Sequence, residues 1–140
     1  MSEYGIYLPV ELNRDAELVQ LPDPDDLTVF THFMQEWVNG LFEIVGVRPC
    51  LELPRKSVLV CNEEGKLLHM PVNLKATAWY SRPGLHDYIV GPVLLLNTKM
   101  TEDGPTCCGW TKETARSLLN GISLFNEVEA MILGTTDRVE

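Results

Sequence analysis

Two apolar runs separated by a polar segment form the clearest pattern in the middle of the chain. Residues 58–61 (VLVC) and 67–70 (LLHM) flank the polar segment 62–66 (NEEGK). Two β-favouring runs around a loop that contains Asn and Gly are typical of a β-hairpin. Gly65 can adopt the positive φ that such a loop needs. Pro71 lacks an N–H and is expected to end the second strand of this predicted hairpin.

Further strands are predicted on both sides of this segment. Residues 88–96 are apolar almost throughout, which indicates a central strand covered on both faces, with a bulge or bend at Gly91-Pro92. Residues 4–10 and 17–21 are two more β-favouring runs, and the polar turn between them predicts an N-terminal hairpin. Because proline cannot donate to a ladder, Pro9 favours an edge position for its strand.

An amphipathic helix is predicted between the N-terminal hairpin and residue 40. Asp23 is a suitable N-cap, and Pro24 suits the first helical position. Asn39-Gly40 is the expected stop. Apolar residues recur at spacings of three and four, which predicts one stripe packed against a sheet: Leu27, Phe30, Met34, Trp37, Val38 and Leu41.

The remaining segments complete the expected order of elements. Residues 41–47 (LFEIVGV) predict a strand, and residues 73–80 predict a short helix. Residues 98–110 are polar and rich in Gly and Pro, which indicates a surface loop. Two helices are expected in the C-terminal part, over residues 111–121 and 122–133. Thr111 is the expected cap of the first of them, and Asn120-Gly121 is its expected stop.

These elements predict an α+β fold. The chain of 140 residues fits a single compact domain over 1–140. We expect a mainly antiparallel sheet of about five to six strands, packed against two to three helices.

The chain is acidic, with a formal net charge of −9. Direct binding to nucleic acid relies on clustered Lys and Arg, so we expect none. An acidic surface could meet a basic protein partner, mimic DNA, or only maintain solubility. No run reaches the ~18 apolar residues of a membrane span, and no signal-peptide pattern is visible. We therefore expect a cytoplasmic protein with no membrane contact.

The four cysteines do not follow a metal-binding pattern. Cys50, Cys61, Cys107 and Cys108 contain no CxxC pair, and their spacing resembles no zinc module. In a cytoplasmic protein, four free thiols are the simplest expectation. The sequence also lacks a phosphate-binding loop, GxSxG, HExxH and a dinucleotide fingerprint. We predict no catalytic residue, no metal ligand and no cofactor, and therefore no enzyme.

Candidate ligand-binding residues come from polar and aromatic positions. The segment WYSRPGLHDY, over residues 79–88, is the best local candidate, because aromatic residues and Arg dominate binding surfaces. Glu43 is the single charge of its predicted strand, and is either a ligand-facing carboxylate or an exposed residue. Asn62 and Asn73 either contact a ligand or act as a turn former and a helix cap. The predicted ligand-binding set is Glu43, Asn62, Asn73, Trp79, Tyr80 and Arg82.

The string VLVCNEEGKLLHMPVN, followed after a gap by DYIVGPVLLLN and a Thr-initiated helix, resembles a known family. That family is DUF3846, a domain of unknown function common in bacteriophage and plasmid-related genomes. The resemblance covers roughly residues 4–120, so the helix over 122–133 could be an addition. It implies a small α+β domain encoded by a phage accessory gene, and supplies no activity or catalytic residues.

Two alternative functions are therefore expected. The first is a non-enzymatic bacteriophage accessory protein in the host cytoplasm that binds a host protein, for example to counter host defence. The alternative is a protein that binds or sequesters a small nucleotide ligand, since aromatic rings stack on bases and Arg holds phosphate. Such binders often place their sites at a homodimer interface.

Overall fold

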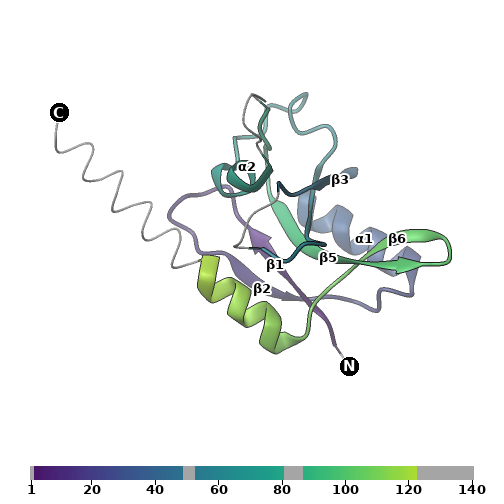
Figure 1. Ribbon diagram of the computed structural model, residues 1–140. Helices are drawn as coiled ribbons and strands as arrows, with labels where there is room; N and C mark the ends of the chain where they lie inside the picture. The colour runs from purple at the N-terminus through teal and green to yellow at the C-terminus, as the bar shows by residue number, and fades with distance from the viewer. Residues whose placement is uncertain (1, 49–52, 81–86, 123–140) are drawn as a thin grey trace, which may run out of the picture.

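The computed structural model describes residues 2–48, 53–80 and 87–122 of the chain. It is a six-stranded antiparallel sheet with three helices, so the predicted α+β class is confirmed (Figure 1). The labelled elements are β1 (Tyr4–Leu8), β2 (Glu17–Gln20), α1 (Leu27–Val38), β3 (Phe42–Gly46), β4 (Val58–Asn62), α2 (Leu74–Tyr80), β5 (Val93–Thr101) and β6 (Gly104–Cys108). A third helix begins at residue 112 and is described to residue 122.

Both faces of the sheet are covered by helices. The strand order is β2-β1-β5-β4-β3, and β6 pairs with β5. On one face, α1 packs its buried Phe30, Met34 and Val38 on the strands. On the other face, α2 and the helix over residues 112–122 form a second core cluster with the strands. The chain therefore folds as three layers, with the sheet in the middle.

Strand β5 is the centre of this sheet. It pairs with β1 and β4 through its first half, and with β6 through its second half. Residues Val93–Leu96 are fully buried, as expected for a strand covered on both faces. Gly91 has a φ of 78° and precedes the strand, so the predicted interruption at Gly91-Pro92 marks the point where β5 begins.

The predicted loop over residues 98–110 is wrong. Strand β5 continues to Thr101, and the chain returns as β6, with Thr101 opposite Gly104. Gly104 has a φ of 105°, which suits a tight turn. The polar composition of the segment fits the exposure of the far end of this hairpin, from Thr101 to Asp103.

The predicted hairpin over residues 58–70 is also wrong, because its second strand does not form. The backbone turns instead: the N–H of Leu68 donates to the carbonyl of Glu64 at 2.9 Å, and that of Met70 to Gly65 at 3.0 Å. Strand β4 pairs with β3 and β5. Gly65 has no positive φ. It is glycine for space, since a Cβ there would lie 2.6 Å from Val90 Cγ2.

Two corrections concern the N-terminal part of the chain. Strands β1 and β2 pair as predicted, but β1 also pairs with β5 and is not an edge strand. Pro9 is compatible with this position because it lies just beyond the end of β1. Helix α1 begins later than predicted, with Asp26 as the N-cap accepting from the N–H of Val29 at 3.2 Å. Its predicted stop is confirmed, since Asn39 adopts a left-handed conformation.

The later helices begin where the sequence predicts. The side chain of Asn73 caps α2 by accepting from the N–H of Ala76 at 3.1 Å. Thr111 caps the following helix in the same way through the N–H of Thr114. That helix continues through the expected stop at Asn120-Gly121. The predicted helix over residues 122–133 lies outside the described part of the chain beyond residue 122. In the described part, no helix is long and apolar enough to cross a bilayer.

Candidate functional site

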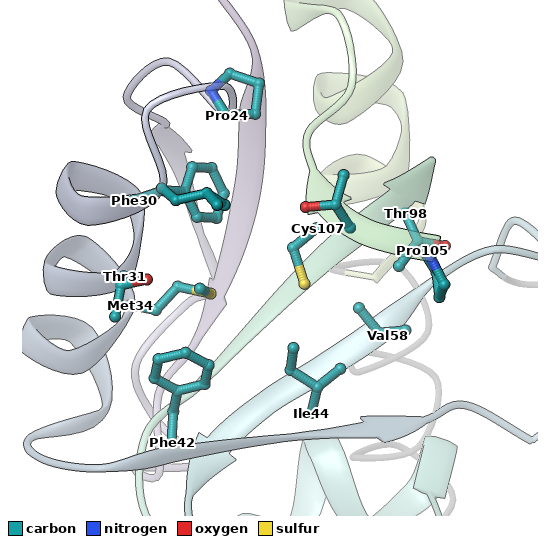
Figure 2. A pocket seen from close by; sticks show the side chains of 12 residues that line it. Pro24, Phe30, Thr31, Met34, Phe42, Ile44, Val58, Thr98, Pro105 and Cys107 are labelled. Carbon is teal, nitrogen blue, oxygen red and sulfur yellow. The ribbon is translucent and has the colours of Figure 1, made fainter. Parts of the chain in front are cut away.

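An apolar groove of about 400 Å³ lies between α1 and the strands β3, β4, β5 and β6. In Figure 2, side chains of α1 face those of β3, β4 and the β5–β6 hairpin across the groove. Its volume falls within the range of roughly 300–1,000 Å³ typical of ligand pockets. The groove is lined by Pro24, Leu27, Phe30, Thr31, Met34, Phe42, Ile44, Val58, Thr98, Pro105, Thr106 and Cys107.

The groove lies where α1 and the β5–β6 hairpin leave space between them on this face of the sheet. Helix α1 contacts β3, β4 and β5. At the mouth of the groove, Leu27 is 68% exposed and Ile44 is 47% exposed. The predicted apolar stripe of α1 is therefore only partly buried, and its first residue is available to a partner. That exposure was invisible in the sequence, where Leu27 fitted the core pattern as well as Phe30 did.

The lining of the groove is suited to binding an apolar group. None of its twelve lining side chains carries a charge, and the polar groups are threonine hydroxyls and one thiol. Burial, with a smaller contribution from neighbouring Cys108, raises the pKa of Cys107 to about 11. The thiol is therefore neutral at physiological pH and acts as a small apolar group. An apolar side chain could enter the groove without leaving a buried charge unpaired.

A second, polar pocket of about 110 Å³ lies on the opposite face of the sheet. It brings together three residues of the predicted ligand-binding set, Glu43 of β3, Asn62 of β4 and Tyr80 of α2. The thiol of Cys61 lies 3.8 Å from Glu43 Oε1 and donates to it. Burial, followed by the charge of Glu43, raises the pKa of Cys61 to about 12. Cys61 is therefore a protonated thiol and not a nucleophile.

A small polar cluster forms the wall of this pocket opposite Glu43. The side chains of Lys66 and Tyr80 both donate to the carboxylate of Asp87, and Tyr80 Oη lies 3.1 Å from Asp87 Oδ2. The hydrogen bond from Lys66 is the main reason that the pKa of Asp87 is lowered. The amine of Lys66 also lies 4.5 Å from the centre of the Tyr88 ring. This cluster was not predicted from the sequence, because residues 66 and 87 are far apart in the chain.

Asn62 and Asn73 have structural roles. The amide of Asn62 donates to the carbonyls of Val38 at 2.9 Å and Asn39 at 3.2 Å, which ties the end of α1 to β4. Its oxygen accepts from the N–H of Glu64 at 2.8 Å. Asn73 is completely buried and caps α2. These contacts agree with the interpretation of both residues as a turn former and a helix cap.

The other two predicted residues do not join the polar pocket in the described structure. Trp79 is 3% exposed and belongs to the core cluster on this face, with its neighbours in α2. Arg82 lies outside the described residues. The structure therefore brings together Glu43, Asn62 and Tyr80, and places Asn73 and Trp79 in the interior.

The described residues also allow a search for metal ligands. Within residues 2–48, 53–80 and 87–122, no group of three or more His, Cys, Asp or Glu side chains is arranged to hold a metal ion. Cys61, Cys107 and Cys108 are buried free thiols. Cys50 lies outside the described residues.

Comparison with known proteins adds the family. The family model described as Domain of unknown function (DUF3846) matches residues 6–120. The comparisons with curated proteins and with solved structures give no significant match. The matched region begins within β1 and ends in the last described helix, so it contains both the apolar groove and the polar pocket. The chain therefore belongs to the DUF3846 family.

Proposed function

We propose that the protein is a small non-enzymatic accessory protein of a bacteriophage, which binds a host protein in the host cytoplasm and thereby counters a host defence. The observation that carries the binding proposal is the open apolar groove of about 400 Å³. Exposed apolar surface is costly in water, and a contiguous patch is typical of an interaction site.

The groove and the net charge together describe the partner. The groove takes an apolar side chain or short apolar segment, because its lining is uncharged. The chain around it is acidic, with a net charge of −9. A partner with basic residues beside its apolar segment is favoured by the long-range field, which accelerates encounter.

Two matched variants in the first turn of α1 test the proposal. Leu27→Asp places a charge in the groove, whereas Val29→Asp places the same charge on the same turn outside it. Both substitutions add an acid near a helix N-terminus, where it is tolerated. We expect affinity purification from host cells to recover one host protein with the wild type and Val29→Asp, and at least tenfold less of it with Leu27→Asp. Equal recovery by both variants would contradict a role for the groove.

The alternative function is the binding of a small molecule, such as a nucleotide signal, in the polar pocket. It is supported by the meeting of Glu43, Asn62 and Tyr80 in one pocket. The volume of about 110 Å³ is below the usual range for ligands. Three carboxylates and one amine line it, those of Glu43, Glu63, Asp87 and Lys66. This charge balance favours a cationic or neutral hydrogen-bonding group over a phosphate.

Thermal unfolding in the presence of candidate ligands tests this alternative. A nucleotide at about 100 times its dissociation constant should stabilise the folded state by about 2.7 kcal/mol. We expect Glu43→Gln to abolish such a shift if the ligand binds in the polar pocket. No shift with any nucleotide at saturating concentration would rule this function out.

A further inference from the structure

Strand β3 lies at one end of the sheet with an open outer edge. It pairs with β4, and among the described residues no other strand pairs with it. A hydrogen bond just before β3 shows which residues of the strand direct their backbone groups toward β4. The N–H of Glu63 donates to the carbonyl of Leu41 at 2.8 Å, and Leu41 is opposite Glu63 in the register that continues to Glu43 opposite Cys61.

Hydrogen-bonded pairs alternate along an antiparallel ladder. Since Leu41 points its carbonyl toward β4, Glu43 and Val45 do the same. The N–H and carbonyl groups of Phe42, Ile44 and Gly46 therefore point outward, away from the sheet. Among the described residues, these groups form a regular set of donors and acceptors without a backbone partner along the edge of β3.

The side chains of β3 do not protect this edge. Natural edge strands are shielded by charged side chains, Pro, bulges or short length, but β3 (FEIVG) has Glu43 as its single charge and pairs with β4 over its full length without a bulge. Its central residue Ile44 is 47% exposed. The opposite edge, β2, is a shorter strand with exposed Glu17 and Gln20 at its ends. An open edge with one charge among apolar side chains is a template for another strand.

We propose that two copies of this chain pair through β3 in antiparallel fashion, with Ile44 opposite Ile44 of the partner subunit. The strand is self-complementary in this register. In this register, the residues whose backbone groups point outward in one subunit (42, 44 and 46) lie opposite the same three residues of the partner subunit. Phe42 then lies opposite Gly46 of the partner subunit, where a Cβ meets nothing within 4 Å. An aromatic ring covering an edge glycine is a favourable cross-strand pair.

The charges of β3 also suit this register. Glu43 is its single charged residue, and it lies opposite Val45 of the partner subunit. The two glutamates are therefore not placed directly against each other, which would be destabilising. Any register shifted by one residue would oppose outward and inward backbone groups and lose the ladder.

Pairing through β3 would also complete the apolar groove. Phe42 and Ile44 line the groove at its β3 side, and their side chains point to the α1 face of the sheet. In the dimer, the partner's Ile44 and Phe42 lie on this same face, and they extend the apolar wall. The two grooves then lie on one continuous sheet, related by the two-fold axis. This arrangement does not depend on the identity of the molecule that enters the groove.

Charge variants at the two-fold axis test the proposal by sedimentation and native mass spectrometry. We expect the wild type to have twice the 15.8 kDa mass of one chain. Ile44→Lys alone and Ile44→Asp alone should each be monomeric, since like charges would meet at the axis. An equimolar mixture of the two should form a dimer. Leu12→Lys is the matched control, because Leu12 is 70% exposed and lies outside β3.

Circular dichroism of each variant shows whether it keeps the native fold. A monomeric wild type, or a dimer that survives Ile44→Lys, would overturn the proposal. A mixture of well-folded Lys and Asp variants that stays monomeric would overturn the pairing at Ile44. Dissociation by Leu12→Lys would equally assign the interface to another surface.

Discussion

Asn73 shows how one buried amide holds three segments of the chain together. Its nitrogen donates to the carbonyls of Leu8 and Gly91, each at 2.9 Å, and its oxygen accepts from the N–H of Ala76. These contacts join the end of β1, the start of α2 and the turn before β5. All three of these hydrogen bonds of the buried side chain are therefore made within the protein.

We predict that Asn73→Ala lowers the free energy of unfolding by about 3 kcal/mol, because two buried carbonyls lose their donor and α2 loses its cap. Urea unfolding measures the change. Asn120→Ala is the control, since Asn120 is exposed, and it should change stability by less than about 0.5 kcal/mol. A loss below about 1 kcal/mol for Asn73→Ala would contradict the network.

The thiol of Cys61 predicts a pH dependence of stability. Its pKa is raised from 9.0 to about 12 in the folded chain, chiefly by burial. Between these values the unfolded chain releases the proton and the folded chain keeps it, so stability falls as pH rises. The stability that the folded state gains from keeping this thiol protonated is fully present below pH 9 and is lost above about pH 12.

Urea unfolding of the wild type and Cys61→Ala over the alkaline range measures this contribution. The variant should lose stability less steeply, by about 1 kcal/mol per pH unit above pH 9. The comparison of slopes removes the constant cost of the cavity that alanine leaves. Parallel slopes would show that the thiol titrates alike in both states.

At the scale of elements, local signals predicted the helices well. The N-caps at Asn73 and Thr111 and the stop at Asn39-Gly40 are encoded by single side chains and short spacings, and all three are confirmed. Asp23 was the wrong cap of α1, because it caps a preceding turn through the N–H of Asp25. The structure selects Asp26, whose side chain accepts from the N–H of Val29, three residues later.

Strand pairing was predicted less well, because it depends on distant parts of the chain. Residues 67–70 have the apolar composition of a strand, yet β4 already has a partner on each side, β3 and β5. The sequence of β6 lacks the apolar pattern of a strand. Among the described strands, β6 pairs with β5 alone. The apolar groove was missed for the same reason: its lining comes from five separate elements.

At the scale of the whole molecule, the net charge of −9 acts on every association. Salt screens such charges over a Debye length of about 10 Å at 0.1 M. Two identical acidic chains repel each other, whereas an acidic chain attracts a basic partner. The two associations proposed above therefore have opposite dependences on salt.

We predict that raising salt from about 0.05 to about 0.5 M strengthens dimerisation through β3 and slows binding of the host protein. Sedimentation equilibrium measures the first effect, and association kinetics with the purified partner measures the second. Leu27→Asp and Val29→Asp add the same charge and should shift the salt dependence of dimerisation equally. Weaker dimerisation at high salt would contradict an interface that is mainly apolar.

The position of β5 in the chain has a consequence for how the protein is made. Its partner β1 comes near the start of the chain, and β4 in the middle, so both are synthesised well before β5. The β1–β2 and β3–β4 pairs are joined in the sheet only through β5, so they cannot join until residues 93–96 have left the ribosome. Assembly of the sheet therefore waits for β5, and until then the nascent chain exposes the apolar edges of two separate strand pairs.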